Sequence, residues 1–153
     1  PRSCQQKSLG GFLRDEKLAV VRTPNYFVSA DPYERNIDTF GRVPNEGELF
    51  YGLLQDGNDQ WNATFFCGSC TVIRRAPLEA IGGVAVETVT ADAHTAIRLH
   101  TQGWRRTSIP IPQAAALATA TLPSPVAQRT PRARAMAPPP RLANPTVTNA
   151  LTP

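Results

Sequence analysis

Proline is unevenly distributed along this 153-residue chain, and its distribution limits where regular structure can form. Ten of the fifteen prolines lie at or after Pro110. Proline lacks a backbone donor and clashes with the preceding helical turn, so Pro123, Pro125 and Pro131 are each expected to break or kink a helix. Residues 113–121 remain compatible with a helix. By this composition we expect roughly the last thirty residues to be poorly ordered.

Charge divides the chain at a nearby point. All twelve acidic residues lie at or before Asp92, so the excess positive charge lies after it. It is carried by Arg98, Arg105, Arg106, Arg129, Arg132, Arg134 and Arg141. A basic segment of this kind can meet phosphates, anionic lipid or nucleic acid. Aromatic side chains that could stack on bases are nearly absent from it, which disfavours nucleic acid as a partner.

The first half of the chain has clear helix and strand signals, and its length suffices for a domain with a core. Residues 17–22 form an apolar run that predicts a buried strand. Asp31 and Pro32 predict a capped helix start, with Tyr33, Ile37 and Phe40 facing inward up to a stop at Gly41. Residues 45–55 predict a second helix, ending before the turn-rich residues 56–59. Its expected apolar face is Leu49, Phe50, Leu53 and Leu54.

The pattern continues with alternating strands and helices. Residues 64–74 predict a strand interrupted at Gly68, where the missing side chain permits close approach of a ligand. A short helix over residues 76–81 and a strand over residues 84–89 follow. Thr90 is placed to cap a helix that runs to Gln102 and ends at Gly103. This alternation predicts an α/β layer architecture.

Cysteine content and hydropathy indicate whether the chain has a metal site, which redox compartment suits it and whether it spans a membrane. Cys67 and Cys70 form a Cys-x-x-Cys pair, which is typical of redox sites or of half a zinc site. Only His94 and His100 could complete a zinc site, and their spacing does not suit one, so we expect no metal site. An odd cysteine count is consistent with a reducing compartment. No run of about 20 apolar residues occurs, so we expect no membrane span in this chain.

Two short segments carry the side chains that could bind a ligand or take part in a reaction. Residues 65–69 read Phe-Phe-Cys-Gly-Ser, and residues 86–95 read from a predicted strand into the next helix with Asp92 near its start. A carboxylate in that position could act as a general base, or it could only stabilise the helix N-terminus. The first segment could position a ligand, or it could be a buried strand with a glycine bulge.

Long stretches of the chain resemble one family at almost every position. They include residues 22–27, 31–36, 43–52, 55–59, 65–69, 80–83 and 86–99, with a fainter match over 111–115 and 134–136. In these stretches the chain is similar to processive family 2 glycosyltransferases, specifically the catalytic subunits of bacterial cellulose synthase. The match over residues 45–59 disfavours other processive synthases, such as those that make hyaluronan or chitin.

The resemblance implies a fold and an activity. Residues 1–109 would be the second half of a Rossmann-like, GT-A-type glycosyltransferase domain, and residues 110–153 a basic, proline-rich tail matching a degraded interfacial-helix region. The reaction would transfer glucose from UDP-glucose, with inversion, to a growing β-1,4-glucan. The full-length family protein would lie at the cytosolic face of the bacterial inner membrane, with a periplasmic partner subunit and Mg²⁺ or Mn²⁺.

The resemblance also implies roles for single residues. Asp92 would be the catalytic base. Phe66, Cys67, Gly68 and Ser69 would bind the acceptor. Four more positions would support the site, namely Thr90, Thr23, Gln128 and Arg129.

The chain departs from the family pattern in four respects. Arg22 replaces a glutamine and puts a charge in an expected loop, and Ala91 replaces the glutamate before the base. The motif Gln-x-x-Arg-Trp has Pro131 and Arg132 at its last two positions, which should damage donor binding and glucan stacking. The Asp-x-Asp metal motif, the uridine-binding acidic motif, the transmembrane helices and the cyclic di-GMP-binding domain of the family are absent from the printed sequence. We therefore expect the isolated chain to be inactive; the alternative function is a non-catalytic remnant that binds glucan or a partner subunit.

Overall fold

A three-stranded mixed sheet forms the centre of the structure, a computed structural model that describes residues 2–68 and 70–135. Its order is β3-β1-β4. β1 (Leu18–Arg22) pairs antiparallel with β3 (Thr71–Ile73) and parallel with β4 (Arg105–Ser108). All five residues of β1 are buried, as its apolar sequence predicts. The predicted strand is therefore confirmed, and Arg22 is its buried last residue rather than part of a loop.

A second, two-stranded sheet extends the structure beyond the first. β2 (Asn25–Phe27) pairs in parallel with β5 (Ala114–Ala116), so a segment after residue 110 pairs with one near residue 26. The helix considered for residues 113–121 is therefore wrong. The unpaired edge of β2 offers backbone partners to this segment, and alanine fits either state when such partners are available.

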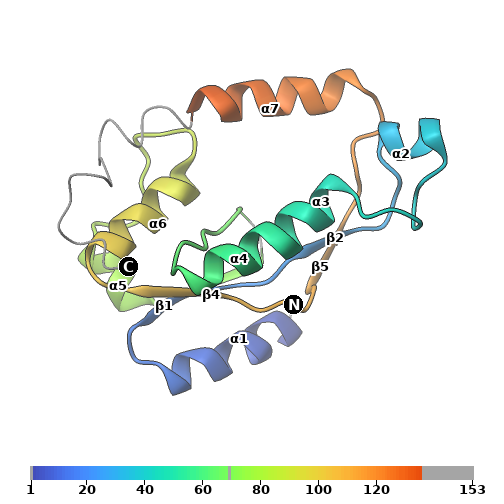
Figure 1. Ribbon diagram of the computed structural model, residues 1–153. Helices are drawn as coiled ribbons and strands as arrows, with labels where there is room; N and C mark the ends of the chain where they lie inside the picture. Colours follow the sequence, from blue (N-terminus) through green and yellow to red (C-terminus); the bar gives the residue numbers. More distant parts are fainter. Residues whose placement is uncertain (1, 69, 136–153) are drawn as a thin grey trace.

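Helices cover both faces of the central sheet, as Figure 1 shows. α1 (Arg2–Arg14) packs against β1 from one side, and the helix ending in α4 (Gln55–Gln60) packs against β4 from the other. α5 (Arg75–Ala80) and α6 (Ala91–Thr101) follow β3 in the chain. α7 (Pro123–Ala135) runs apart from the sheets along the top of the view.

The start of α2 (Pro32–Ile37) confirms the sequence prediction. The Asp31 carboxylate accepts from the Glu34 N–H at 2.8 Å, and the Glu34 carboxylate accepts from the Asp31 N–H at 2.8 Å, which is a complete capping box. The predicted inward face is wrong, because Tyr33 and Ile37 are 54% and 69% exposed. Phe40 is exposed too, and the helix ends before Gly41, at Asp38 in the left-handed conformation.

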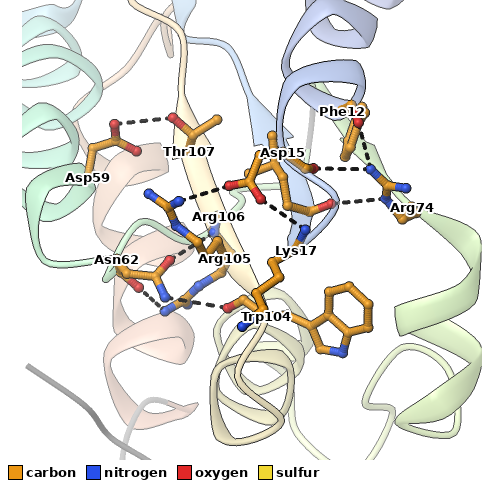
Figure 2. Close-up of polar contacts among 11 residues, drawn as sticks. Phe12, Asp15, Lys17, Asp59, Asn62, Arg74, Trp104, Arg105, Arg106 and Thr107 are labelled. Atoms are coloured by element: carbon orange, nitrogen blue, oxygen red, sulfur yellow. Dashed lines mark hydrogen bonds and ion pairs between the residues drawn. The ribbon is translucent and has the colours of Figure 1, made fainter.

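The next helix is longer than predicted. α3 (Glu46–Glu48), the π-helical turn η1 (Leu49–Leu54) and α4 are continuous, so the turn expected over residues 56–59 is wrong. The Asp59 carboxylate accepts from the Thr107 hydroxyl at 3.2 Å, as Figure 2 shows. It also accepts from the Ser108 N–H at 2.8 Å, and the two bonds fix the last helical turn against β4. The predicted apolar face is wrong at Leu49, Leu53 and Leu54, which are exposed.

Two predicted strands are shorter or missing. Within residues 64–74 only β3 is a strand, and residues 84–89 are irregular. Val86 and Val89 are exposed, and the Ala85 N–H donates to the Thr95 hydroxyl at 2.9 Å instead of to a neighbouring strand. β-Branched composition favours strands only where a sheet edge is available. The short helix over residues 76–81 is confirmed by α5.

α7 contradicts the prediction that prolines interrupt this part of the chain. Pro123 and Pro125 lie in its first turn, where a missing N–H costs nothing because those donors have no helical acceptor. Pro131 lies inside the helix. The predicted disorder over the last thirty residues is thus wrong for residues up to 135, and residues 136–153 lie outside the described residues.

The core is small and lies between the sheet and α6. Its buried members are Ala19, Val20, Phe66 and Leu99, with Ile73, Ile81 and Trp104 packed against them. One end of it is closed by Arg74, whose guanidinium donates to the carbonyls of Phe12 and Leu18 at 2.8 and 3.1 Å. Figure 2 shows this closure beside the Arg105–Asp15 ion pair, which is 3.0 Å long.

Candidate active site

The segment around Cys67 is an irregular stretch between α4 and β3. Phe66 anchors it in the core, and the Cys67 thiol is half-buried with the Phe65 carbonyl as acceptor at 3.8 Å. Gly68 has φ 75°, a conformation that favours glycine, and a side chain at this position would meet nothing within 4 Å. Among the described residues, space is therefore open beside Gly68. Ser69 lies outside the described residues.

The start of α6 carries the candidate base. Asp92 is the second residue of the helix, half-buried, and its carboxylate accepts from the Ala93 N–H at 2.9 Å. Thr90 occupies the N-cap position as predicted but makes no capping bond. Its hydroxyl instead donates to the Ala135 carbonyl at 3.0 Å, which ties the start of α6 to the end of α7.

Three charged side chains from different elements act on the Cys67 thiol. Burial is the largest cause and raises the pKa of Cys67 to about 11. Arg22 lowers that pKa, Asp92 raises it and Arg132 lowers it, in decreasing order. Arg22 belongs to β1, Asp92 to α6 and Arg132 to α7, so charges on three elements influence this thiol. At neutral pH the thiol is protonated, which makes it a weak hydrogen-bond donor rather than a nucleophile.

The supporting residues occupy two different environments. Thr23 is buried, and both its N–H and its hydroxyl donate to the Cys70 carbonyl, at 2.9 and 3.2 Å. This clamp fixes the end of the Cys67 segment against the end of β1. Gln128 and Arg129 are exposed on α7.

Sequence reasoning missed Tyr51 and gave Arg22 only a disruptive role. Tyr51 lies in η1, and its hydroxyl accepts from the Asn25 side-chain amide at 3.4 Å. Burial raises the pKa of Tyr51, Cys67 raises it further, and Asn25, Arg22 and Arg132 lower it. Both Tyr51 and Asn25 lie in the stretches that resemble the family, and their polar side chains could have been considered for the site. Only the fold shows that the two side chains contact each other.

A second polar cluster joins α6 to β4 away from these groups. The Arg106 guanidinium donates to the Asn62 carbonyl and, at 2.6 Å, to Nδ1 of His100. His100 Nδ1 also lies 3.1 Å from the Asn62 carbonyl. Burial lowers the pKa of Arg106 to about 10. Its partners are a carbonyl and an imidazole of the same fold, so this cluster joins α6 to β4.

The part of the chain that the structure describes was searched for metal ligands and for membrane-spanning helices. In residues 2–68 and 70–135, no group of three or more His, Cys, Asp or Glu side chains is placed to hold a metal ion. These residues therefore do not fit the Mg²⁺ or Mn²⁺ of the family. Among the same residues, no helix has both the length and the apolar character needed to cross a membrane.

The described residues of this region include a carboxylate at Asp92, a thiol at Cys67 and an open backbone position at Gly68. A carboxylate can remove a proton from a hydroxyl group within hydrogen-bond reach.

No family model matches the chain, but relatives named as cellulose synthases do. A "Cellulose synthase catalytic subunit [UDP-forming]" of Xanthomonas axonopodis pv. citri (strain 306) is 64% identical over 144 residues, which is 94% of this chain and 20% of the relative. The protein of the same name in Pseudomonas fluorescens (strain SBW25) is 64% identical over 136 residues, or 89% of this chain and 18% of the relative.

A more distant relative agrees with these two. A "Cellulose synthase 1 catalytic subunit [UDP-forming]" of Komagataeibacter xylinus is 50% identical over 135 residues, 88% of this chain and 18% of the relative. The chain spans about a fifth of the length of the first two relatives. The resemblance to cellulose synthase catalytic subunits is confirmed over about nine tenths of the chain.

Proposed function

We propose that this chain is the acceptor-binding and catalytic-base segment of a UDP-glucose-dependent cellulose synthase catalytic subunit. The observation that carries the proposal is the 64% identity to two proteins named as cellulose synthase catalytic subunits. In the structure, Thr23 at the end of β1 holds the Cys70 carbonyl through two hydrogen bonds, and burial is the main cause that raises the pKa of the nearby Cys67 thiol. We infer that the α/β fold is part of a Rossmann-like, GT-A-type domain, with residues 1–109 in that domain and residues 110–153 in an interfacial tail.

In this proposal, Asp92 acts as the general base. The terminal glucan hydroxyl gives its proton to the Asp92 carboxylate while its oxygen bonds to the anomeric carbon of UDP-glucose, and the bond to UDP breaks with inversion. Phe66, Cys67, Gly68 and Ser69 hold the acceptor, so that positioning supplies much of the rate. Thr23 and Thr90 support these segments through their bonds to Cys70 and Ala135. Gln128 and Arg129 are assigned a supporting role on α7.

A divalent ion, when bound in a complete synthase, would neutralise the leaving diphosphate. The described residues do not fit such an ion, so no step above is assigned to it. The complete protein is proposed to lie at the cytosolic face of the bacterial inner membrane with a periplasmic partner subunit and to thread the glucan across it. The 153-residue chain by itself is proposed to be inactive.

The test replaces the matching segment of the Xanthomonas relative with this chain, carrying Pro131→Arg and Arg132→Trp. We expect glucan synthesis from labelled UDP-glucose, and we expect Asp92→Asn in the same chimaera to lower the rate by at least about a hundredfold. Glu87→Gln is the matched control, because Glu87 is an exposed carboxylate nearby in the sequence. The proposal would be contradicted by full activity in the Asp92→Asn chimaera. It would also be contradicted by no activity in the chimaera that carries only Pro131→Arg and Arg132→Trp.

A second candidate function is supported by Pro131, which lies inside α7 and interrupts the motif that holds donor and acceptor in the family. Under this alternative the chain is a non-catalytic remnant that binds glucan or a partner subunit. Calorimetric titration separates the two, since a synthase segment in the chimaera should bind UDP-glucose with a divalent ion. A remnant should retain only β-1,4-linked oligoglucan.

A further inference from the structure

The helix over residues 46–60 contains a feature that its sequence does not predict. Its middle, η1, is π-helical over six residues. π-Helical turns are rare and occur frequently at functional sites, because they widen the backbone ladder and turn side chains out of the regular helical order. A side chain that bonds to a carbonyl inside the helix favours such a break. In η1 this side chain is Arg22, which donates through Nη2 to the Tyr51 carbonyl at 3.3 Å.

Arg22 has no exposed surface. Its guanidinium also donates through Nη1 to the Ser108 hydroxyl at 3.2 Å, and its central carbon lies 5.0 Å from the centroid of the Tyr51 ring. Among the described residues, its Nε has no hydrogen-bond partner, and no ion pair includes this side chain. A buried cation without an ion pair is costly. Stability alone therefore does not account for an arginine here.

The carbonyl and the ring of Tyr51, which Arg22 contacts, border the candidate acceptor site. Tyr51 and Cys67 each perturb the titration of Arg22, and Cys67 and Arg132 perturb that of Tyr51. The Phe50 ring, next to Tyr51 in the chain, makes an edge contact with the Phe65 ring at 6.1 Å between centroids, so η1 lies against the segment that contains Cys67. Asn25 holds the Tyr51 hydroxyl, at 3.4 Å.

We propose that Arg22 is a positioning residue of the acceptor site, which keeps η1 in its π-helical form and so holds the Tyr51 ring beside Cys67 for a β-1,4-glucan end. The inference rests on the proposed function for its ligand. It gives the replacement of glutamine by arginine a role, since glutamine could donate to the Tyr51 carbonyl but could neither stack on the ring as a cation nor reach Ser108 at the same time.

The test uses Arg22→Gln and Arg22→Lys in the 153-residue chain, with two readouts. The first is the affinity for cellohexaose by calorimetry, which we expect to weaken about tenfold in both variants, the size of one lost aromatic contact. The second is the rate of alkylation of Cys67 by iodoacetamide at pH 9 to 10, followed by peptide mass spectrometry. Arg22→Gln should slow it several-fold, because the charge that favours the thiolate is gone, whereas Arg22→Lys should retain most of it.

Arg105→Gln is the matched control, because Arg105 is an exposed arginine of β4 that pairs with Asp15 on the far side of the sheet. It should change neither readout. Tyr51→Leu covers the case in which Arg22→Gln does not fold, since it removes the ring while Arg22 and its bond to the carbonyl of residue 51 remain; it should weaken cellohexaose binding to the same degree. Unchanged affinity in folded Arg22→Gln or in Tyr51→Leu overturns the proposal.

The two proposals fail in different ways. If the unaltered chain does not bind cellohexaose, the acceptor assignment fails for both. If it binds, but the Arg22 variants bind equally well and alkylate at the unaltered rate, only the positioning role of Arg22 is overturned.

Discussion

Single side chains set the response of this molecule to pH. His94 and His100 are the only histidines in the chain. Burial is the main cause that lowers the pKa of each; Arg98 adds to it at His94 and Arg106 at His100, against smaller opposing effects of Glu87 and the Asn62 carbonyl. The folded protein therefore resists protonation of both rings more than the unfolded chain does.

The sign of the pH effect follows directly. With folded pKa values below the unfolded value, stability is fully present above about pH 6.5 and falls as the pH drops below it, by at most about 1.4 kcal/mol per pH unit for each histidine. We expect the free energy of unfolding, measured by urea titration, to decline between pH 7 and pH 5. The decline should be shallower in His94→Gln, in His100→Gln and most of all in the double variant. An equal slope in the double variant would show that other groups dominate.

Among the elements, α2 depends most visibly on one cap. Asp31 and Glu34 each accept from the other's N–H, so Asp31→Ala removes a bond that stabilises the first turn. We expect a loss of about 1 kcal/mol in the free energy of unfolding. Arg35→Ala, at an exposed position of the same helix, should stay within about half of that. A loss as large in the control would assign the effect to general helix propensity.

α7 carries a proline where a helix interior disfavours one. Pro131→Ala restores an N–H that can donate to the carbonyl four residues earlier, and it removes a ring clash worth roughly 3 kcal/mol. We expect more helical signal in far-UV circular dichroism and a higher melting temperature. Thr130→Ala is the control, because it changes the neighbouring side chain, whose hydroxyl donates to the Val126 carbonyl at 2.9 Å, without restoring a backbone donor. No gain over Thr130→Ala would mean that the helix already accommodates the break.

Local signals in the sequence identified the elements that depend on local chemistry. The apolar run of β1, the Asp31 cap and the left-handed Gly103 after α6 follow from nearby residues alone. Elements that depend on distant partners were not predictable. Residues 84–89 have strand composition but no available sheet edge, and residues 114–116 become a strand because β2 offers one.

The candidate site shows the same division. The resemblance assigned roles to Asp92 and Cys67, and the fold brings their charges into mutual influence. Arg22 was expected in a loop. It is instead buried at the end of β1, where its guanidinium packs against the Tyr51 ring of η1. No spacing rule links positions 22 and 51. Such contacts are set by how the helix over residues 46–60 crosses the sheet.

The molecule as a whole leaves much apolar surface exposed. Leu53 and Trp61 are each 72% exposed, and Leu49 and Leu53 line a shallow hollow with Pro44. Exposed apolar patches bind hydrophobic dyes and favour association. We expect ANS fluorescence and concentration-dependent light scattering from the isolated chain, and we expect Leu53→Glu to lower both. Gln60→Glu adds the same charge at an exposed position nearby, so an equal decrease there would attribute the effect to net charge.

The central position of β1 has a consequence for how the chain reaches its fold. Its parallel partner is distant in sequence: 86 residues separate Arg22 from Ser108, which it contacts across the sheet. Closing a loop of that length raises the contact order, which slows folding. On the ribosome, the buried residues of β1 therefore stay without their parallel neighbour until the residues of β4 have emerged, and during this interval the nascent protein is exposed to aggregation.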